Sequence, residues 1–249
     1  MTVKFRKLHN FSILFQQYPV DFINLLRRVA LTQIPTFAID QVLVCTNQSP
    51  LSDEMLAHRL AMIPFAVPLS KQKLFDCLED KTEYEENVYN IEFKGNGREN
   101  QEFVTIRQLF QPHDHVTLGL SNNDDIMITP LDNGCSIWLK ARLTLGTLKD
   151  HAKWQSCWAY LYHFDYKAEL PDFMEDSELA ALIQKAFDHY NNLVRNINGD
   201  DRNNTLKKLK YNKLDKYDQT LLFIESHSEY TEIEILKLSV FKFMQIPCL

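Results

Sequence analysis

The clearest alternation of apolar and polar positions lies between residues 20 and 64. Its first part makes one apolar stripe at helical spacing, formed by Phe22, Leu25, Leu26, Val29 and Ala30. This stripe predicts an amphipathic helix that ends before Pro35, because the residue preceding a proline resists the α conformation. The next run, TFAIDQVLVC, is apolar and β-branched enough to predict a buried strand. A second short helix then begins at Ser52, whose side chain can cap it, and Pro64 closes it.

Short β-forming runs alternate with turn residues between Pro64 and Gly146. The predicted strands are NVYNIEFKG, VTLGL, DIMITP and CSIWLKARLTLG, and Gly-Asn-Gly, Asn-Asn-Asp-Asp and Asp-Asn-Gly turns separate them. FVTIRQLF fits either a strand or a short helix. Residues 66–145 are therefore expected to form a small β-rich module inserted into the path of the main chain.

The strictest period of two residues follows, in a predicted strand over residues 157–166. One face carries Trp158, Tyr160, Tyr162, Phe164 and Tyr166, and the other carries Cys157, Ala159, Leu161, His163 and Asp165. An exposed row of aromatic rings is a platform on which nucleic-acid bases stack. Because the strand itself contains no Lys or Arg, we favour the alternative, a sheet face covered by helices.

Two more helices are predicted near the end of the chain. Residues 175–197 have a strong apolar stripe at helical spacing, and residues 198–218 have a polar, linker-like composition. After a predicted strand, TLLFIES, Thr231 and Glu234 have the spacing of a capping box that opens a helix. This last helix is apolar on more than one side, and its own sheet covers only one, so we expect a helix of another chain to cover the rest.

The amino-acid composition and the net charge exclude several classes of function. The net charge is −6 and the chain has 6 glycines, with no glycine-rich phosphate loop and no extended basic face. The cysteines are far apart and form no C-x-x-C pair; they are Cys45, Cys77, Cys135, Cys157 and Cys248. No run approaches the length of a membrane span, and the start has no signal-peptide pattern. We expect a soluble intracellular protein without membrane or direct nucleic-acid binding.

Histidines supply the candidate catalytic groups. His113-Asp114-His115 suits a metal site by residue type, but adjacent residues rarely converge on one ion, so a polar loop is favoured. His151 has no positioned nucleophile beside it. A metal-dependent hydrolase that uses His113, His115 and His151 is kept as the alternative function. Glu54, His58 and Arg59 form either a catalytic cluster or a polar docking surface on the second helix.

Two motifs carry a family resemblance. LLRRVALTQIPTFAID followed by DEMLAHRLAMIP, and GTLKDHAKW far downstream, resemble the assembly subunit of multisubunit DNA-dependent RNA polymerases. This family comprises the bacterial α, archaeal D and eukaryotic third-largest subunits. The similarity is strong over residues 20–64 and 146–158 and fair over 219–245.

The resemblance implies an α+β fold, with a two-helix-plus-sheet dimerisation domain interrupted by an inserted β-rich domain. The dimerisation domain would comprise residues 1–50 and 146–249, and the insertion would comprise residues 51–145. Bacterial members pair with themselves, whereas archaeal and eukaryotic members pair with a smaller relative of the L or eleventh-subunit type. The chain shows no C-terminal DNA-binding domain of the bacterial kind, so the heterodimer is favoured. The second-largest and largest subunits then assemble on the dimer, and they carry catalysis.

The resemblance also assigns interface residues. The expected dimer interface consists of Phe22, Leu25, Leu26, Val29, Leu236, Val240 and Phe243. The expected large-subunit interface consists of Arg27, Arg28, Asp53, Glu54, His58, Arg59, Lys149, Asp150, His151, Lys153 and Trp154. No catalytic residue is expected, and the protein would act inside a transcription complex, in the nucleus or the cytoplasm.

Some features depart from the family pattern. The insertion contains only Cys77 and Cys135, so neither the zinc loop nor the iron–sulfur module of other members is expected, and no cofactor is expected. Ala61 replaces a glycine that is usual in the second-helix motif, and helix 175–197 has no counterpart. A short, cofactor-free form suits a divergent lineage such as a large DNA virus, with a cofactor-free archaeal form as the alternative.

Overall fold

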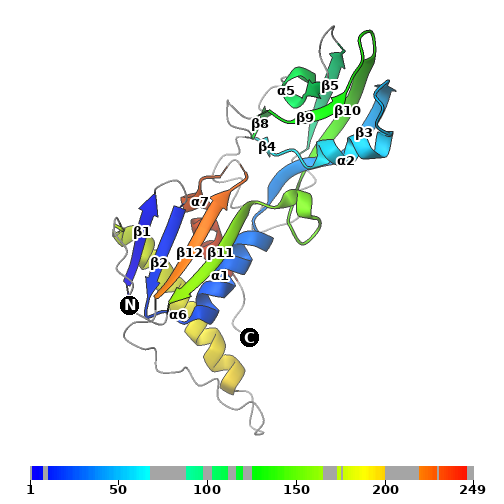
Figure 1. Cartoon of the computed structure of the whole chain (residues 1–249). Coiled ribbons are helices and arrows are strands. Elements are labelled where there is room, and N and C mark those ends of the chain that lie inside the picture. The colour runs from blue at the N-terminus through cyan, green and yellow to red at the C-terminus, as the bar shows by residue number, and fades with distance from the viewer. Residues whose placement is uncertain are drawn as a thin grey trace. The chain divides into compact units, whose positions relative to one another are not determined.

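The computed structural model describes residues 2–7, 11–67, 88–97, 103–111, 116–119, 125–164, 173–174, 176–199, 219–228 and 230–245. The chain divides into two compact units, each described by itself below (Figure 1). Unit 1 comprises residues 1–34, 156–226 and 230–249, and unit 2 comprises residues 35–155 and 227–229. The mixture of helices and antiparallel strands confirms the α+β class.

Unit 1 is a four-stranded antiparallel sheet with helices on one face. Its elements are β1 (Thr2–Lys7), β2 (Phe11–Gln16), α1 (Val20–Thr32), β11 (Cys157–Phe164), α6 (Ser177–Gly199), β12 (Gln219–Ser226) and α7 (Glu232–Met244). The strand order is β1-β2-β12-β11, and every neighbouring pair is antiparallel. The sheet therefore joins the first strands of the chain to strands from its last third.

The helices of unit 1 cover the sheet face that carries Ile13 and Leu222, both fully buried. These two residues lie opposite each other in the β2–β12 ladder, so their side chains share a face. α1 packs against β11 and α7, and α6 packs against α7 and β1. α1 ends at Thr32, before Pro35 as predicted, and α7 opens with the predicted capping box of Thr231 and Glu234.

Unit 2 is built on a second antiparallel sheet of order β3-β10-β5-β7. Its elements are β3 (Thr36–Asn47), α2 (Asp53–Ala61), β4 (Phe65–Ala66), β5 (Tyr89–Asn96), β6 (Phe103–Thr105), α5 (Ile106–Leu109), β7 (Phe110–Gln111), β8 (Thr117–Leu118), β9 (Met127–Pro130), β10 (Ser136–Gly146) and a 3-10 turn, η1 (Ala152–Trp154). FVTIRQLF forms a strand, one helical turn and a second strand. The predicted β-rich character of this stretch is thus present in the described residues.

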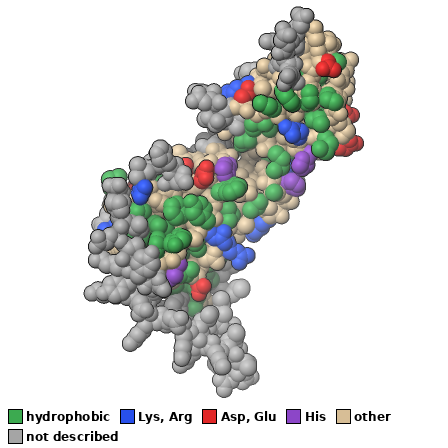
Figure 2. Space-filling view, in the orientation of Figure 1, with side chains coloured by type: hydrophobic (Ala, Val, Ile, Leu, Met, Phe, Trp, Pro, Cys, Tyr) green, Lys and Arg blue, Asp and Glu red, His purple; other side chains and the backbone are tan. Residues whose placement is uncertain are grey.

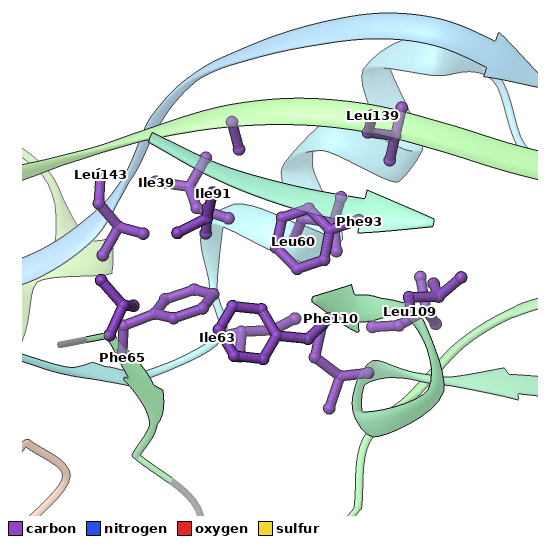
Figure 3. Close-up of a cluster of buried hydrophobic side chains, with 14 of the residues drawn as sticks. Ile39, Leu60, Ile63, Phe65, Ile91, Phe93, Leu109, Phe110, Leu139 and Leu143 are labelled. Atoms are coloured by element: carbon purple, nitrogen blue, oxygen red, sulfur yellow. The ribbon is translucent and has the colours of Figure 1, made fainter. Parts of the chain in front are cut away.

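The core of unit 2 lies between this sheet, α2 and the small strands. The rings of three phenylalanines each contact the other two, with centroids 5.9 to 6.4 Å apart; they are Phe65, Phe93 and Phe110 (Figure 3). Leu60 of α2 is fully buried in the same cluster. Ser52 caps α2 by accepting a hydrogen bond from the Met55 amide, as the sequence predicts. One side of α2 is therefore packed against the core of unit 2, and its other side faces solvent.

β3 differs from the predicted fully buried strand. Only its first residues, Thr36 to Ile39, are buried, and from Asp40 onward its positions are exposed or half-buried. The physical reason is that one face of the sheet is uncovered, so Gln41, Leu43 and Cys45 are exposed while Val42 and Val44 pack against the core. β3 pairs with β10 along its length. Unit 2 begins at Pro35, so the chain enters it directly after α1.

Candidate interaction surfaces

Two helices from opposite ends of the sequence meet in unit 1. The rings of Phe22 in α1 and Phe243 in α7 lie 6.2 Å apart, and both are fully buried. The Ser156 hydroxyl donates a hydrogen bond of 3.0 Å to the carbonyl of Ala30, which ties the end of α1 to the start of β11. The sequence-distant helices are thus fixed beside one sheet.

The residues assigned to a dimer interface lie mostly inside this packing. Leu25 is half-buried, and the others are at most 3% exposed in the chain by itself, namely Phe22, Leu26, Val29, Leu236, Val240 and Phe243. This placement differs from the expected open apolar face. A side chain enclosed by its own chain has little surface left for a partner to cover.

Helix α6 supplies much of the enclosure. The Phe187 ring lies 5.2 Å from the Phe22 ring, and the Tyr190 ring lies 5.5 Å from it. α6 also covers α7, since its His189 ring contacts the Phe243 ring edge-on with ring centroids 5.4 Å apart. The apolar stripe of α6, visible in the sequence, was the signal for this role, although the sequence gives no indication of which helix it covers.

Some apolar surface remains on α1 and α7. Half-buried apolar side chains of the two helices are Leu25, Leu31, Ile233, Phe241 and Met244. Arg28 is exposed, whereas Arg27 is half-buried and donates two hydrogen bonds of 3.0 and 2.9 Å to the Asn24 side-chain oxygen. The exposed arginine and these apolar residues are part of the surface that the helix pair offers to another molecule.

Helix α2 carries an exposed polar face in unit 2. Asp53, Glu54, His58 and Arg59 are all exposed. The Asp53 carboxylate accepts a hydrogen bond from Asn47, and the Arg59 guanidinium donates one of 2.7 Å to the Met127 carbonyl. Glu54 and His58 are four residues apart, so they lie on one side of the helix. This arrangement suits docking to a polar surface.

In the segment 149–154 some residues are exposed, whereas others make contacts inside unit 2. Lys149, Asp150 and His151 are exposed. Lys153 differs from its assigned role, because its ammonium donates hydrogen bonds of 2.9 Å to both the Ile39 carbonyl and the Asp40 carboxylate. The ammonium also lies 4.1 Å from the centre of the Trp154 ring.

Trp154 likewise belongs to the interior of unit 2. Its ring is buried, and its indole N–H donates a hydrogen bond of 3.1 Å to the Thr144 carbonyl. A Cβ atom added to Gly146 would lie 2.5 Å from the ring. The HAKW motif therefore anchors the strand end, and its tryptophan is not available as an exposed contact.

Of the three candidate catalytic histidines, His151 alone lies within the described residues. His113 and His115 lie outside them, and the His151 ring nitrogen Nδ1 accepts a hydrogen bond of 3.1 Å from the Lys153 amide. Within the described ranges no group of three or more His, Cys, Asp or Glu side chains is placed to hold a metal ion. Nothing in this arrangement favours a hydrolase.

Three residues of the predicted aromatic row are exposed on β11, which corrects the expectation that helices cover this face; Phe164 is half-buried, and Tyr166 lies outside the described residues. Trp158 is 61% exposed, and Tyr160 and Tyr162 are also exposed. Tyr160 stacks on Phe223 of β12 with ring centroids 4.6 Å apart. Figure 2 shows hydrophobic side chains gathered over this sheet. Helix α1 covers the opposite face because Cys157 approaches the Ala30 carbonyl to 3.7 Å, a distance that bulky rings would prevent.

None of the helices in the described part of the chain combines the length and apolar character of a membrane span. Residues 12–245 match the model of the family described as the RNA polymerase Rpb3/Rpb11 dimerisation domain, and the chain belongs to this family. The resemblance found in the sequence motifs is thus confirmed.

Curated relatives agree with this assignment. The chain is 35% identical over 147 residues to DNA-directed RNA polymerase subunit Rpo3 of Pyrobaculum aerophilum, covering 59% of this chain and 55% of that protein. It is 37% identical over 164 residues to Rpo3 of Thermococcus kodakarensis, covering 65% of this chain and 59% of that protein. Rpo3 of Pyrococcus furiosus is 35% identical over 164 residues, with the same coverage. The matched stretch spans between half and two thirds of the length of these relatives.

Proposed function

We propose that this chain is a non-catalytic assembly subunit of a DNA-dependent RNA polymerase. The observation that carries the proposal is the family match over residues 12–245 together with the packing of α1 on α7 beside one sheet. The relatives with significant identity are polymerase subunits by name. Catalysis would then belong to the large subunits, and this chain would act inside the transcription complex.

In this proposal unit 1 corresponds to the dimerisation domain, predicted over residues 1–50 and 146–249, and unit 2 corresponds to the insertion domain, predicted over residues 51–145. β3 and residues 146–155 lie in unit 2, outside the predicted insertion. The partner in the dimer is a smaller subunit of the L or eleventh-subunit type. Leu25 and Leu31 of α1, with Ile233, Phe241 and Met244 of α7, are half-buried and retain apolar surface that such a partner can cover. The fully buried residues of the predicted interface support this surface from beneath, because they fix the two helices against each other.

The large subunits dock on the exposed polar faces. In unit 2 these are the outer side of α2, with Asp53, Glu54, His58 and Arg59, and the exposed residues Lys149, Asp150 and His151. In unit 1 Arg28 is the exposed basic residue of the predicted set. Arg27, the other arginine of the predicted set, is half-buried and is held by its hydrogen bonds to Asn24. Charged residues of this kind set orientation and association rate.

A retention experiment tests the function. The tagged full chain is co-expressed with the L-type subunit and the second-largest subunit of its own polymerase, and the complex is isolated through the tag. We expect the second-largest subunit to be retained only when the L-type subunit is present. The double variant Glu54→Lys/His58→Glu should lower that retention at least about tenfold, because it replaces the Glu54 carboxylate with an ammonium group and places a new carboxylate one helical turn further on.

The matched control is Lys185→Glu, a charge reversal at an exposed position of α6 outside the proposed surfaces. It should retain the second-largest subunit like the unaltered chain. If the unaltered chain retains neither partner, the proposed function is wrong. If the double variant and the control behave alike, the assignment of α2 as the docking face is wrong.

A further inference from the structure

A concave surface on unit 2 has no role in the surfaces described so far. It spans β3, β10 and β5, encloses about 660 Å³, and is lined among others by Gln41, Leu43, Asn90, Glu92, Lys140 and Arg142. We call it the cross-strand trough. It lies on the opposite face of the sheet from α2, because Leu139 and Phe93, which flank Lys140 and Glu92 in sequence, are fully buried in the core with Leu60.

One row of side chains crosses the trough. Gln41 of β3 and Asn90 of β5 both lie opposite Arg142 of β10, so the three share a face. All three are exposed. Within the described part of the chain, none of their side chains has a hydrogen-bond or ion-pair partner. The row therefore presents a guanidinium fork flanked by two amides, all available to an outside acceptor.

The backbone around this row is irregular. The β3–β10 ladder shifts register between Trp138 and Leu139 and again between Arg142 and Leu143. Extra residues of this kind bend a strand and increase its twist, and they occur often beside binding sites. The two shifts flank the row, which accounts for a hollow on a face that a regular ladder would leave flatter.

The trough is lined by two cations, Lys140 and Arg142, and one carboxylate, that of Glu92, in a chain whose net charge is −6. Lys140 and Lys94 both face the Trp138 ring, with their ammonium groups 5.4 and 5.6 Å from its centre. The Trp138 indole N–H donates a hydrogen bond to the carboxylate of Glu92. Lys94 lies beside this lining, two residues from Glu92 on β5, so cations outnumber the one carboxylate, which already has a donor. A local excess of positive charge selects an anionic partner.

We propose that the cross-strand trough binds an acidic segment of another polymerase subunit. A carboxylate of that segment pairs with the Arg142 fork, which matches carboxylate geometry with two parallel hydrogen bonds. An apolar side chain of the same segment covers Leu43, which is 63% exposed beside the row. A nucleic-acid backbone fits less well, because Glu92 and the apolar wall oppose a line of phosphates. This inference rests on the proposed function, since it requires assembly into a polymerase.

Site-specific photo-crosslinking in the assembled polymerase tests the proposal. A benzophenone amino acid replaces Leu43 in the full chain, the polymerase is assembled and irradiated, and the joined peptide is identified by mass spectrometry. We expect a segment of another subunit that is rich in Asp and Glu. Met127, which is 60% exposed elsewhere on unit 2, receives the same benzophenone as the control position and should not reach this segment.

Variants of the row give the second readout. With the benzophenone at position 43, Arg142→Glu should lower the yield of the crosslink at least about tenfold, and Arg142→Lys should lower it less, because the charge remains while the fork is lost. Lys185→Glu on α6 should leave the yield unchanged. A crosslink to nucleic acid, to a segment without acidic residues, or to nothing in an assembled polymerase overturns the inference but leaves the proposed function standing. Failure of the unaltered chain to assemble overturns both.

Discussion

The ring of Phe22 in α1 packs edge-on against the ring of Phe187 in α6, with centroids 5.2 Å apart and planes inclined by 64°. Tyr18 joins the same cluster through contacts with both rings. The contact explains how α1 and α7 bury most of their apolar residues without a second chain. α6 is thus a structural part of unit 1, and any partner has to bind on the surface that α6 leaves uncovered.

Removing this contact should destabilise unit 1. Phe187 is almost fully buried, so Phe187→Ala deletes a ring and leaves a cavity, which costs about 3–5 kcal/mol in the free energy of unfolding. Urea unfolding followed by circular dichroism measures the change. Lys185→Ala, at an exposed position of the same helix, should change the free energy by no more than about 0.5 kcal/mol. Equal stabilities of the two variants would show that α6 does not hold α1 in place.

The contact between Gly146 and Trp154 predicts intolerance to any side chain at position 146. A Cβ atom there would lie 2.5 Å from two ring atoms, and the ring is fixed by its hydrogen bond to Thr144. Gly146→Ala should therefore lower the free energy of unfolding of unit 2 by about 1–3 kcal/mol through overpacking. Gly119→Ala is a milder control, since its Cβ would meet Pro64 at 3.3 Å. A Gly146→Ala protein as stable as this control would contradict the packing described.

The thiol of Cys157 should make stability depend on pH. Burial raises the pKa of Cys157 from 9.0 to about 11, against a smaller lowering effect of its hydrogen bond with Ser156. Between these pH values the unfolded chain has lost the thiol proton while the folded chain keeps it. The free energy of unfolding therefore contains a contribution that is complete below about pH 9 and is lost by about pH 11, amounting to about 2–3 kcal/mol.

The comparison that isolates this contribution is Cys157→Ala, because lysines and tyrosines titrate in the same range in both proteins. The unaltered chain should lose more stability than the variant as the pH rises from about 9 to about 11. Reagents for thiols should modify the exposed Cys45 in the folded protein and reach Cys157 only on unfolding. Identical pH slopes, or equal labelling rates, would show that Cys157 is not enclosed beneath α1.

The exposed aromatic row of β11 gives a direct test for nucleic-acid binding. Trp158 and Tyr160 lie on the open face of the sheet, where a stacked base would quench tryptophan fluorescence. Because the chain carries −6, we predict no quenching of the isolated protein by an oligothymidine. Quenching that weakens as salt is added, and that Trp158→Leu abolishes, would instead assign this face to single-stranded nucleic acid.

The sequence predicted the helix starts that are marked by capping residues close to one another in the chain. The Ser52 cap and the Thr231–Glu234 capping box are formed by neighbours in sequence, so their spacing is sufficient to locate the helix starts. The alternation in β11 correctly divided its residues between two faces. It did not show which face is covered, because the close approach of Cys157 to Ala30 depends on a helix more than a hundred residues away.

Long-range packing also accounts for the other differences. The stripe of α1 was visible in the sequence, but the helix that encloses Phe22 comes from residues 177–199, and periodicity does not specify a partner. Trp154 lies in a motif whose resemblance suggested an exposed contact. Its burial follows from the hydrogen bond to Thr144 and the missing side chain of Gly146, which only the strand pairing brings together.

The most direct test of the assembly role is the mass of the particle that this chain forms with its proposed dimer partner. The full chain is co-expressed with the L-type subunit of its own polymerase, and native mass spectrometry measures the purified complex. We predict a one-to-one heterodimer, and Leu25→Glu should weaken it at least about tenfold, since it places a charge on the half-buried surface of α1. A chain that remains monomeric in the presence of that subunit would contradict the account.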